Sequence, residues 1–224
     1  MGESMKRLSC ALAALLGISQ AQTKSVPLDP LNGLKPLNVK AESVTYRGRK
    51  SVRITDASAS APDGARLAIV SGTDFADGVI EAELTGDALP GMPDTVRGFT
   101  GIAFRVSPDG AQYECLYLRP KNGRSEDQLQ RNHSTQYISA PDFPWQRLRS
   151  ETPGKYESYV DLEPGAWTKV KIDVRGDKAR LYVNGAIQPA LIVDDLKRGK
   201  SKGAVALWIG PGVIAHFAQL RIGP

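Results

Sequence analysis

Arginine and aromatic side chains gather in one stretch of the sequence, residues 119–159, which holds five arginines, five aromatic residues and one of the two histidines. Sugar rings stack on flat apolar faces, and their hydroxyl or carboxylate groups bind planar side chains that carry several hydrogen-bond donors. Aromatic and arginine side chains supply both kinds of surface. We therefore expect a site for a glycan or small sugar ligand here, with these binding residues: Arg119, Arg131, Asn132, Gln136, Tyr137 and Trp145.

A structural role for the same stretch is the alternative. A connection of this length with little regular structure is usually functional or disordered, and its aromatic residues and prolines argue against disorder. Its arginines could instead pair with carboxylates such as Glu126, Asp127 and Glu151 and so pin a large loop, with Trp145 packed beneath it. The sequence leaves both interpretations open.

Strand-like alternation over residues 113–119 separates two sets of side chains. Tyr117 and Arg119 share one face, whereas Glu114 shares the other face with two leucines. A buried carboxylate is costly unless it is paired, so we expect an arginine, Arg105 or another, to meet Glu114. Arg105, Tyr117 and Arg119 are therefore candidates for ligand binding, with a structural ion pair as the alternative for the two arginines.

His133 and Glu114 are the candidates for acid–base catalysis. The ordinary pKa of histidine, roughly 6.5, suits proton transfer near neutral pH, although a lone histidine in a loop can equally serve as a hydrogen-bonding residue. The sequence has no H-x-x-x-H pattern and no aspartate-rich calcium loop. We expect no bound metal and no cofactor, and the sequence leaves open whether the protein is an enzyme.

The first 21 residues have the pattern of a secretory signal peptide. Lys6 and Arg7 supply the positive start, residues 8–18 form an apolar run, and Ser19-Gln20-Ala21 fits a cleavage site. The run is too short to cross a bilayer as a helix, so we expect no membrane span after cleavage and a periplasmic or secreted protein. Cys115 is then the single cysteine, and no internal disulfide can form.

The positive charge of the chain is spread thinly. The formal net charge is +5 over 224 residues, and the sequence has no run of five lysines or arginines. The densest basic segment, residues 197–202, lies between two apolar strands and is typical of a solvated turn. Together with the export signal, this argues against nucleic acid as a partner.

Period-two alternation dominates the chain from Val39 onward, and turn signals recur about every 8 to 12 residues. This spacing predicts an all-β fold, a two-sheet antiparallel β-sandwich. One domain, residues 37–224, follows an N-terminal arm, residues 22–36. Inward positions of the strands predict these core residues: Val170, Ile172, Val174, Leu181, Val183, Val205 and Leu207.

Several segments resemble known β-sandwich domains. Residues 167–174, 179–185 and 217–222 resemble the second half of concanavalin A-like lectin/glucanase jelly rolls. Residues 75–83 and 101–105 resemble the first half, as found in DUF1080 (3-keto-disaccharide hydrolase) and laminin-G-like domains. The resemblance implies a jelly-roll fold, and the functions found in this superfamily include lectins, glycosidases, lyases and adhesion modules. The paired-acid motif Glu-x-Asp-x-x-Glu of family 16 glucanases is absent from this sequence.

Three functions are compatible with these features. The first is an exported protein that binds a glycan or sugar derivative and could also cleave it. The second is a glycoside hydrolase or lyase of the DUF1080 type that uses arginine, histidine and tyrosine side chains with one carboxylate. The third is a non-catalytic cell-envelope or adhesion module whose long loop is structural.

Overall fold

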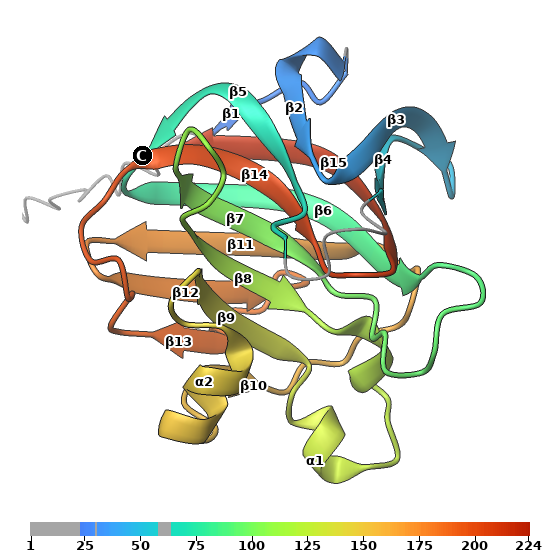
Figure 1. The fold of residues 1–224 in the computed structure, drawn as a ribbon, viewed down its shortest axis with the longest axis vertical. Coiled ribbons are helices and arrows are strands. Elements are labelled where there is room, and N and C mark those ends of the chain that lie inside the picture. The colour runs from blue at the N-terminus through green and yellow to red at the C-terminus, as the bar shows by residue number, and fades with distance from the viewer. Residues whose placement is uncertain (1–22, 30, 58–63) are drawn as a thin grey trace, which may run out of the picture.

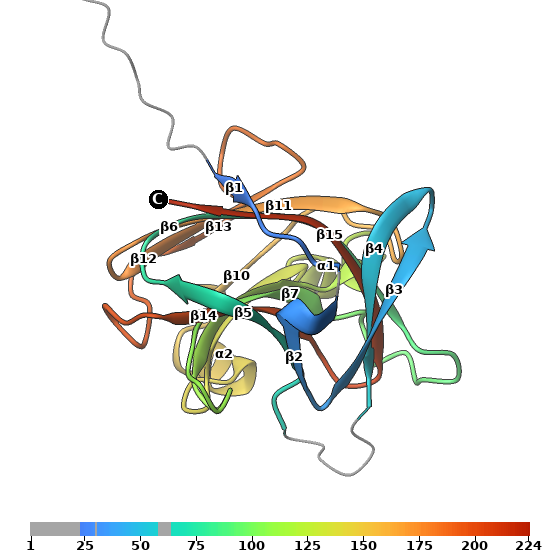
Figure 2. The same ribbon diagram turned by 90° about the horizontal axis from the view of Figure 1, so that it is seen from above.

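Two antiparallel sheets stack face to face in the computed structural model, which describes residues 23–29, 31–57 and 64–224 (Figures 1 and 2). The expected all-β, two-sheet sandwich is confirmed. The expected signal peptide, residues 1–21, lies outside the described residues. Within the described ranges, no helix has the length and apolar character needed to cross a membrane.

The larger sheet has eight strands and contains both ends of the described chain. Its strands are β1 (Lys24–Ser25), β3 (Val39–Tyr46), β4 (Arg49–Asp56), β6 (Gly78–Ala88), β11 (Thr168–Arg175), β12 (Lys178–Val183), β13 (Leu191–Val193) and β15 (Val213–Gly223). Their order is β13-β12-β11-β6-β15-β4-β3, and β1 also pairs with β15. The last strand of the chain therefore lies inside the sheet.

The smaller sheet has seven strands. They are β2 (Leu34–Leu37), β5 (Leu67–Phe75), β7 (Thr100–Val106), β8 (Tyr113–Leu118), β9 (Thr135–Ala140), β10 (Glu157–Ser158) and β14 (Gly203–Ile209). Their order is β10-β9-β8-β7-β14-β5-β2. The short helix α2 (Trp145–Glu151) lies on the side of this sheet that faces away from the larger sheet (Figure 2).

The core lies between the two sheets, as the alternation predicts. In β11, Val170, Ile172 and Val174 point inward and are buried, whereas Lys169 points to the other face and is exposed. All of the predicted core residues are at most 5% exposed. Each such side chain contributes about 1.5 to 3 kcal/mol through burial of apolar surface.

The stretch predicted to have little regular structure contains β9, β10, the 3-10 helix η2 (Pro120–Asn122), α1 (Gln128–Arg131) and α2. The prediction is wrong for β9 because this strand is buried on both faces, so polar and apolar residues do not alternate along it. The polar residues Gln136 and Ser139 are buried, as is Tyr137. The segment expected as an N-terminal arm supplies β1 to the larger sheet and most of β2 to the smaller one.

Candidate functional site

Strand pairing places three polar side chains in one row on the smaller sheet. Glu157 of β10 lies opposite Gln136 of β9, and Gln136 lies opposite Tyr117 of β8. Because directly paired residues point to the same face of a sheet, the three side chains share one face. Arg119, which follows β8, hydrogen-bonds both Gln136 and Tyr117, so it lies over this row.

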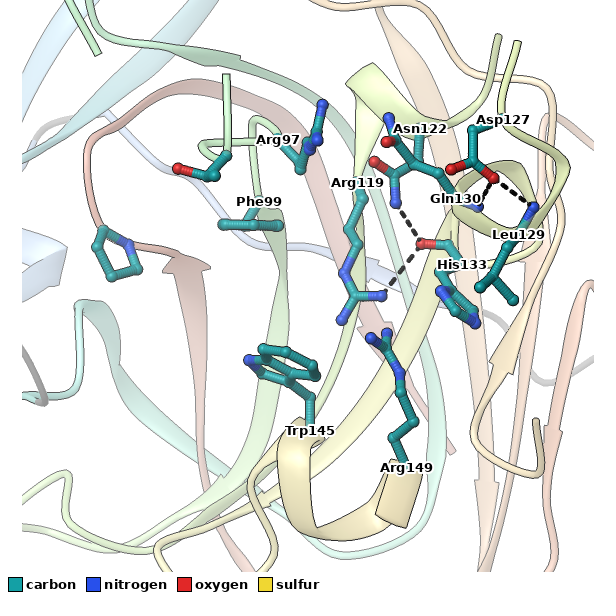
Figure 3. A pocket seen from close by; sticks show the side chains of 12 residues that line it. Arg97, Phe99, Arg119, Asn122, Asp127, Leu129, Gln130, His133, Trp145 and Arg149 are labelled. Carbon is teal, nitrogen blue, oxygen red and sulfur yellow. Dashed lines mark hydrogen bonds between the residues drawn. The ribbon is translucent and has the colours of Figure 1, made fainter. Parts of the chain in front are cut away.

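A cleft of about 610 Å³ opens at this end of the sheet (Figure 3). Its walls come from the segment before β7, the end of β8, the segment around α1, and α2. In Figure 3, Arg119 and Arg149 point toward one another beside Trp145. The lining residues are Thr95, Arg97, Phe99, Arg119, Asn122, Asp127, Leu129, Gln130, His133, Trp145, Arg149 and Pro211.

The carboxylate of Glu157 holds the charged groups on one side of the cleft. Arg149 donates from Nε to Oε1 at 2.7 Å and from Nη2 to Oε2 at 2.9 Å, which is a bidentate ion pair. His133 Nε2 lies 2.9 Å from Oε2, and Arg119 Nη1 lies 3.9 Å from the same oxygen. The Glu157 side chain is only 2% exposed. It therefore acts as a shared anchor for Arg149 and His133.

The guanidinium group of Arg119 is buried among neutral oxygen atoms. Its Nη1 donates to the carbonyl oxygen of His133, and its Nη2 donates to the Tyr117 hydroxyl and to Oε1 of Gln136. The Arg119 residue is 5% exposed. Burial raises the pKa of the Tyr117 hydroxyl, so this partner stays neutral. Arg119 is thus a rigidly held, desolvated cation at the base of the cleft.

His133 is neutral near neutral pH. Burial lowers its pKa and outweighs the opposing effect of Glu157, and the neighbouring Arg149 and Arg119 lower the pKa further. A neutral imidazole can donate from only one ring nitrogen, and Glu157 can only accept, so His133 donates from Nε2.

Trp145 presents an aromatic face to the cleft. It is the first residue of α2, directly after Pro144, whose extended backbone ends the preceding segment. Arg149 lies one helical turn later, and the i, i+4 spacing brings its guanidinium carbon to 4.6 Å from the centre of the indole ring. The Arg119 guanidinium carbon lies 5.6 Å from the same ring. With 38% of Trp145 exposed, part of the indole remains available to a ligand.

The predicted binding residues occupy three kinds of position. Arg119, His133 and Trp145 line the cleft, and Tyr117 and Gln136 lie buried behind Arg119, which they bind. The others lie outside the cleft lining. Arg131 donates to the Ser125 carbonyl oxygen, Asn132 is exposed and accepts from Gln128, and three residues are buried elsewhere: Arg105, Glu114 and Tyr137.

Glu114 and Tyr137 lie in the interior of the sandwich. Tyr137 pairs with Leu116 and so shares the inward face of the sheet with Glu114. Its hydroxyl donates to Glu114 Oε2 at 2.6 Å, and the backbone N–H of Arg198 donates to Oε1. Burial and the adjacent carboxylate raise the pKa of Tyr137, which keeps the hydroxyl protonated. The expected arginine partner of Glu114 is therefore wrong, because a tyrosine on the neighbouring strand takes its place.

Arg105 lies at the opposite end of β7 from the residues that line the cleft. The register between β7 and β14 shifts near this residue, and Arg105 adopts a φ of 53°. Such a bulge redirects a side chain out of the regular alternation. The guanidinium donates to the carbonyl oxygens of Ala76, Gly176 and Gly199, and to Asp77. Arg105 thus ties three turns together.

Several residues that line the cleft or lie behind it were not predicted from the sequence. Arg97 and Phe99 follow a proline- and glycine-rich segment with no strand pattern, and Glu157 is in a strand of only two residues. The i, i+4 spacing of Trp145 and Arg149 was the signal in the sequence that could have placed both side chains on one helix face.

In the described ranges, no three His, Cys, Asp or Glu side chains gather in a way that could hold a metal ion.

The chain matches no protein-family model and no curated protein sequence. Solved structures with the same fold include the carbohydrate-binding module CBM66 from Bacillus subtilis, at 14% identity and a TM-score of 0.58, with 85% of this chain and 96% of that chain covered. A Bacillus subtilis protein of unknown function with a galectin-like fold has 11% identity and a TM-score of 0.55, covering 86% and 90%. A cellulose-induced protein has 12% identity and a TM-score of 0.51, covering 89% and 96%.

The strand content, the two antiparallel sheets and these similarities define a jelly-roll β-sandwich. The fold is of the concanavalin A-like type, as the sequence resemblance implied. At these levels of identity the similarity establishes the fold alone. The narrower resemblance to DUF1080 and laminin-G-like domains remains a prediction from the sequence.

Proposed function

We propose that this protein binds a short glycan, outside the cytoplasm, in the cleft between Trp145 and the end of β8. The observation that carries the proposal is a partly exposed indole held beside a buried guanidinium in a cleft of about 610 Å³. A cleft of this size is within the usual range for small-molecule sites. Trp145 would stack on a sugar ring while Arg119 binds its oxygen atoms.

Amide groups on the opposite side of the cleft support a sugar ligand. Asn122 and Gln130 both line the cleft. Asn122 Nδ2 donates to the His133 carbonyl oxygen, whereas its Oδ1 is buried and has no hydrogen-bond partner within the described residues. A sugar hydroxyl is both a donor and an acceptor, so it could satisfy an amide oxygen of this kind. The carbohydrate-binding module among the similar folds is consistent with such a ligand.

The carboxylates favour binding over cleavage. Most glycoside hydrolases place two carboxyl groups on either side of the scissile bond. Among the described residues that line the cleft, Asp127 is the single carboxylate, and its Oδ1 accepts from the backbone N–H groups of Leu129 and Gln130. Glu157 is buried and already bound by Arg149 and His133. We therefore propose a binding protein, with a hydrolase or lyase as the alternative.

Substitution of Trp145 by alanine tests the binding site. We expect glycan affinity to fall by about tenfold, because the substitution removes the stacking face. Calorimetry against a panel of oligosaccharides would identify a ligand for the unaltered protein first and then compare variants. Tyr159→Ala is the matched control, since Tyr159 is an exposed aromatic residue that does not line the cleft. Equal loss in both variants, or no loss at Trp145, would contradict the proposed site.

Export is tested separately. We expect the protein recovered from the periplasm or the medium to begin at Gln22, because Ser19-Gln20-Ala21 fits the cleavage pattern. Mass spectrometry of the intact chain gives the N-terminus directly. A secreted form that retains Met1 would show that the signal assignment is wrong.

A further inference from the structure

We propose that the cleft selects acidic sugars, and specifically that Arg119 binds the carboxylate of a uronic acid whose ring lies on Trp145. This inference rests on the proposed glycan-binding function and adds the class of ligand. The proposal is based on the charged side chains in the cleft and on whether each of them already has a partner of opposite charge in the protein.

Arg119 is a buried cation without a close anionic partner. Its hydrogen bonds go to a carbonyl, a hydroxyl and an amide oxygen, all of them neutral. The nearest carboxylate oxygen among the described residues, Oε2 of Glu157, is 3.9 Å away and already lies within 3 Å of both Arg149 and His133. A desolvated charge is unfavourable unless it is paired. A ligand carboxylate that reaches Arg119 would supply the missing anion.

The cleft as a whole has an excess of positive charge. Three guanidinium groups line it, those of Arg97, Arg119 and Arg149. Two carboxylates oppose them: Glu157 forms a bidentate pair with Arg149, and Asp127 accepts backbone N–H groups at the start of α1. The side chain of Arg97 has no hydrogen bond or ion pair within the described part of the chain. Three guanidinium groups against two carboxylates leave a net positive potential for an anion in the cleft.

The remaining lining indicates a ring attached to that anion. Phe99, Leu129, Trp145 and Pro211 give the cleft apolar surfaces around the guanidinium groups. Figure 3 shows the Arg119 guanidinium pointing into the space beside the indole of Trp145. A small inorganic anion would leave these surfaces uncovered, and a neutral sugar would leave Arg119 unpaired. A uronic acid combines a ring that stacks with a carboxylate that pairs.

Matched pairs of oligosaccharides test the proposal on the intact protein. Oligomers of glucuronic, galacturonic and mannuronic acid are each compared by calorimetry with their carboxyl-reduced forms, which keep the linkages and replace the carboxylate by a hydroxymethyl group. We expect at least one acidic oligomer to bind about tenfold or more tightly than its reduced form. We also expect about 1 M NaCl to weaken binding of the acidic oligomer far more than binding of the reduced one.

The Arg97→Met variant tests the role of the cleft charge. Arg97 has no partner in the described structure, so its replacement should leave the melting temperature unchanged while lowering the preference for the acidic oligomer severalfold. Arg147→Met is the matched control, because it also removes one positive charge, in this case from α2. Arg147 binds Glu151 and the Asp142 carbonyl oxygen and does not line the cleft. We expect this control to keep the preference.

The outcomes separate the two proposals. Equal affinity for acidic and reduced oligomers in every pair would overturn acidic selectivity and leave glycan binding standing. An equal loss of preference in Arg97→Met and Arg147→Met would assign the effect to net charge and overturn the role of the cleft. Oligomers of neutral sugars that carry sulfate groups serve as a further probe. If they bind and the uronic acid oligomers do not, the carboxylate is not the group that the cleft recognises. Absence of binding by any oligomer would overturn both proposals.

Discussion

Replacement of Arg105 by alanine is expected to lower the free energy of unfolding by about 3 kcal/mol. The Arg105 side chain is 1% exposed and donates to three carbonyl oxygens and one carboxylate. These acceptors belong to three turns that lie far apart in the sequence, at Ala76–Asp77, Gly176 and Gly199. Without the guanidinium, the turns lose their common donor. Urea denaturation followed by fluorescence measures the change.

Arg124→Ala is the matched control for Arg105. Arg124 also binds two acidic residues, Asp161 and Glu163, but its side chain is 60% exposed. Exposed ion pairs contribute little because water competes for both partners, so we expect almost no change in melting temperature. Glycan binding by any folded Arg105→Ala protein should be retained, since Arg105 does not line the cleft. Comparable unfolding curves for both variants would contradict the structural role of Arg105.

Replacement of Glu157 by glutamine is expected to destabilise the fold by about 3 kcal/mol and to abolish ligand binding. The buried Glu157 carboxylate compensates Arg149 and orients His133. A neutral amide leaves Arg149 without its anion and removes the negative charge beside the neighbouring Arg119. Arg149 and Arg119 should then separate, and Trp145, which lies beside both, should lose its fixed position. Denaturation and calorimetry report the two effects independently.

Glu151→Gln provides the comparison within the same segment. Glu151 pairs with Arg147 on the surface of α2, and its side chain is 51% exposed. We expect a change of about 0.5 kcal/mol or less and unaltered glycan binding. A destabilisation by Glu157→Gln no larger than that of Glu151→Gln would show that the buried pair contributes nothing.

Alternation along single strands predicts the fold class and part of the site. The sequence places Tyr117 and Arg119 on one face of β8 and Glu114 on the other, and the structure has this arrangement. The reason is that a regular strand has a fixed period of two, which local sequence reveals. The predicted position of Trp145 near Arg119 is also found in the cleft.

The remainder of the site depends on features without a local signal. Arg105 departs from the alternation at a β-bulge, which a period-two pattern cannot show. Glu157 reaches the cleft only because its two-residue strand pairs with β9, and β9 itself lacks alternation. Arg97 enters the cleft from a segment more than 20 residues before Arg119. Such contacts are set by long-range pairing.

The position of β15 determines when the chain can fold. This final strand lies between β6 and β4, and Phe217 pairs with Leu84 on one side and Val52 on the other. Until β15 is available, the edges of β6 and β4 that face it have no hydrogen-bond partner. Pairs so distant in sequence are slow to form. The larger sheet therefore cannot be completed before β15 has been made, because β6 and β4 are joined only through this strand.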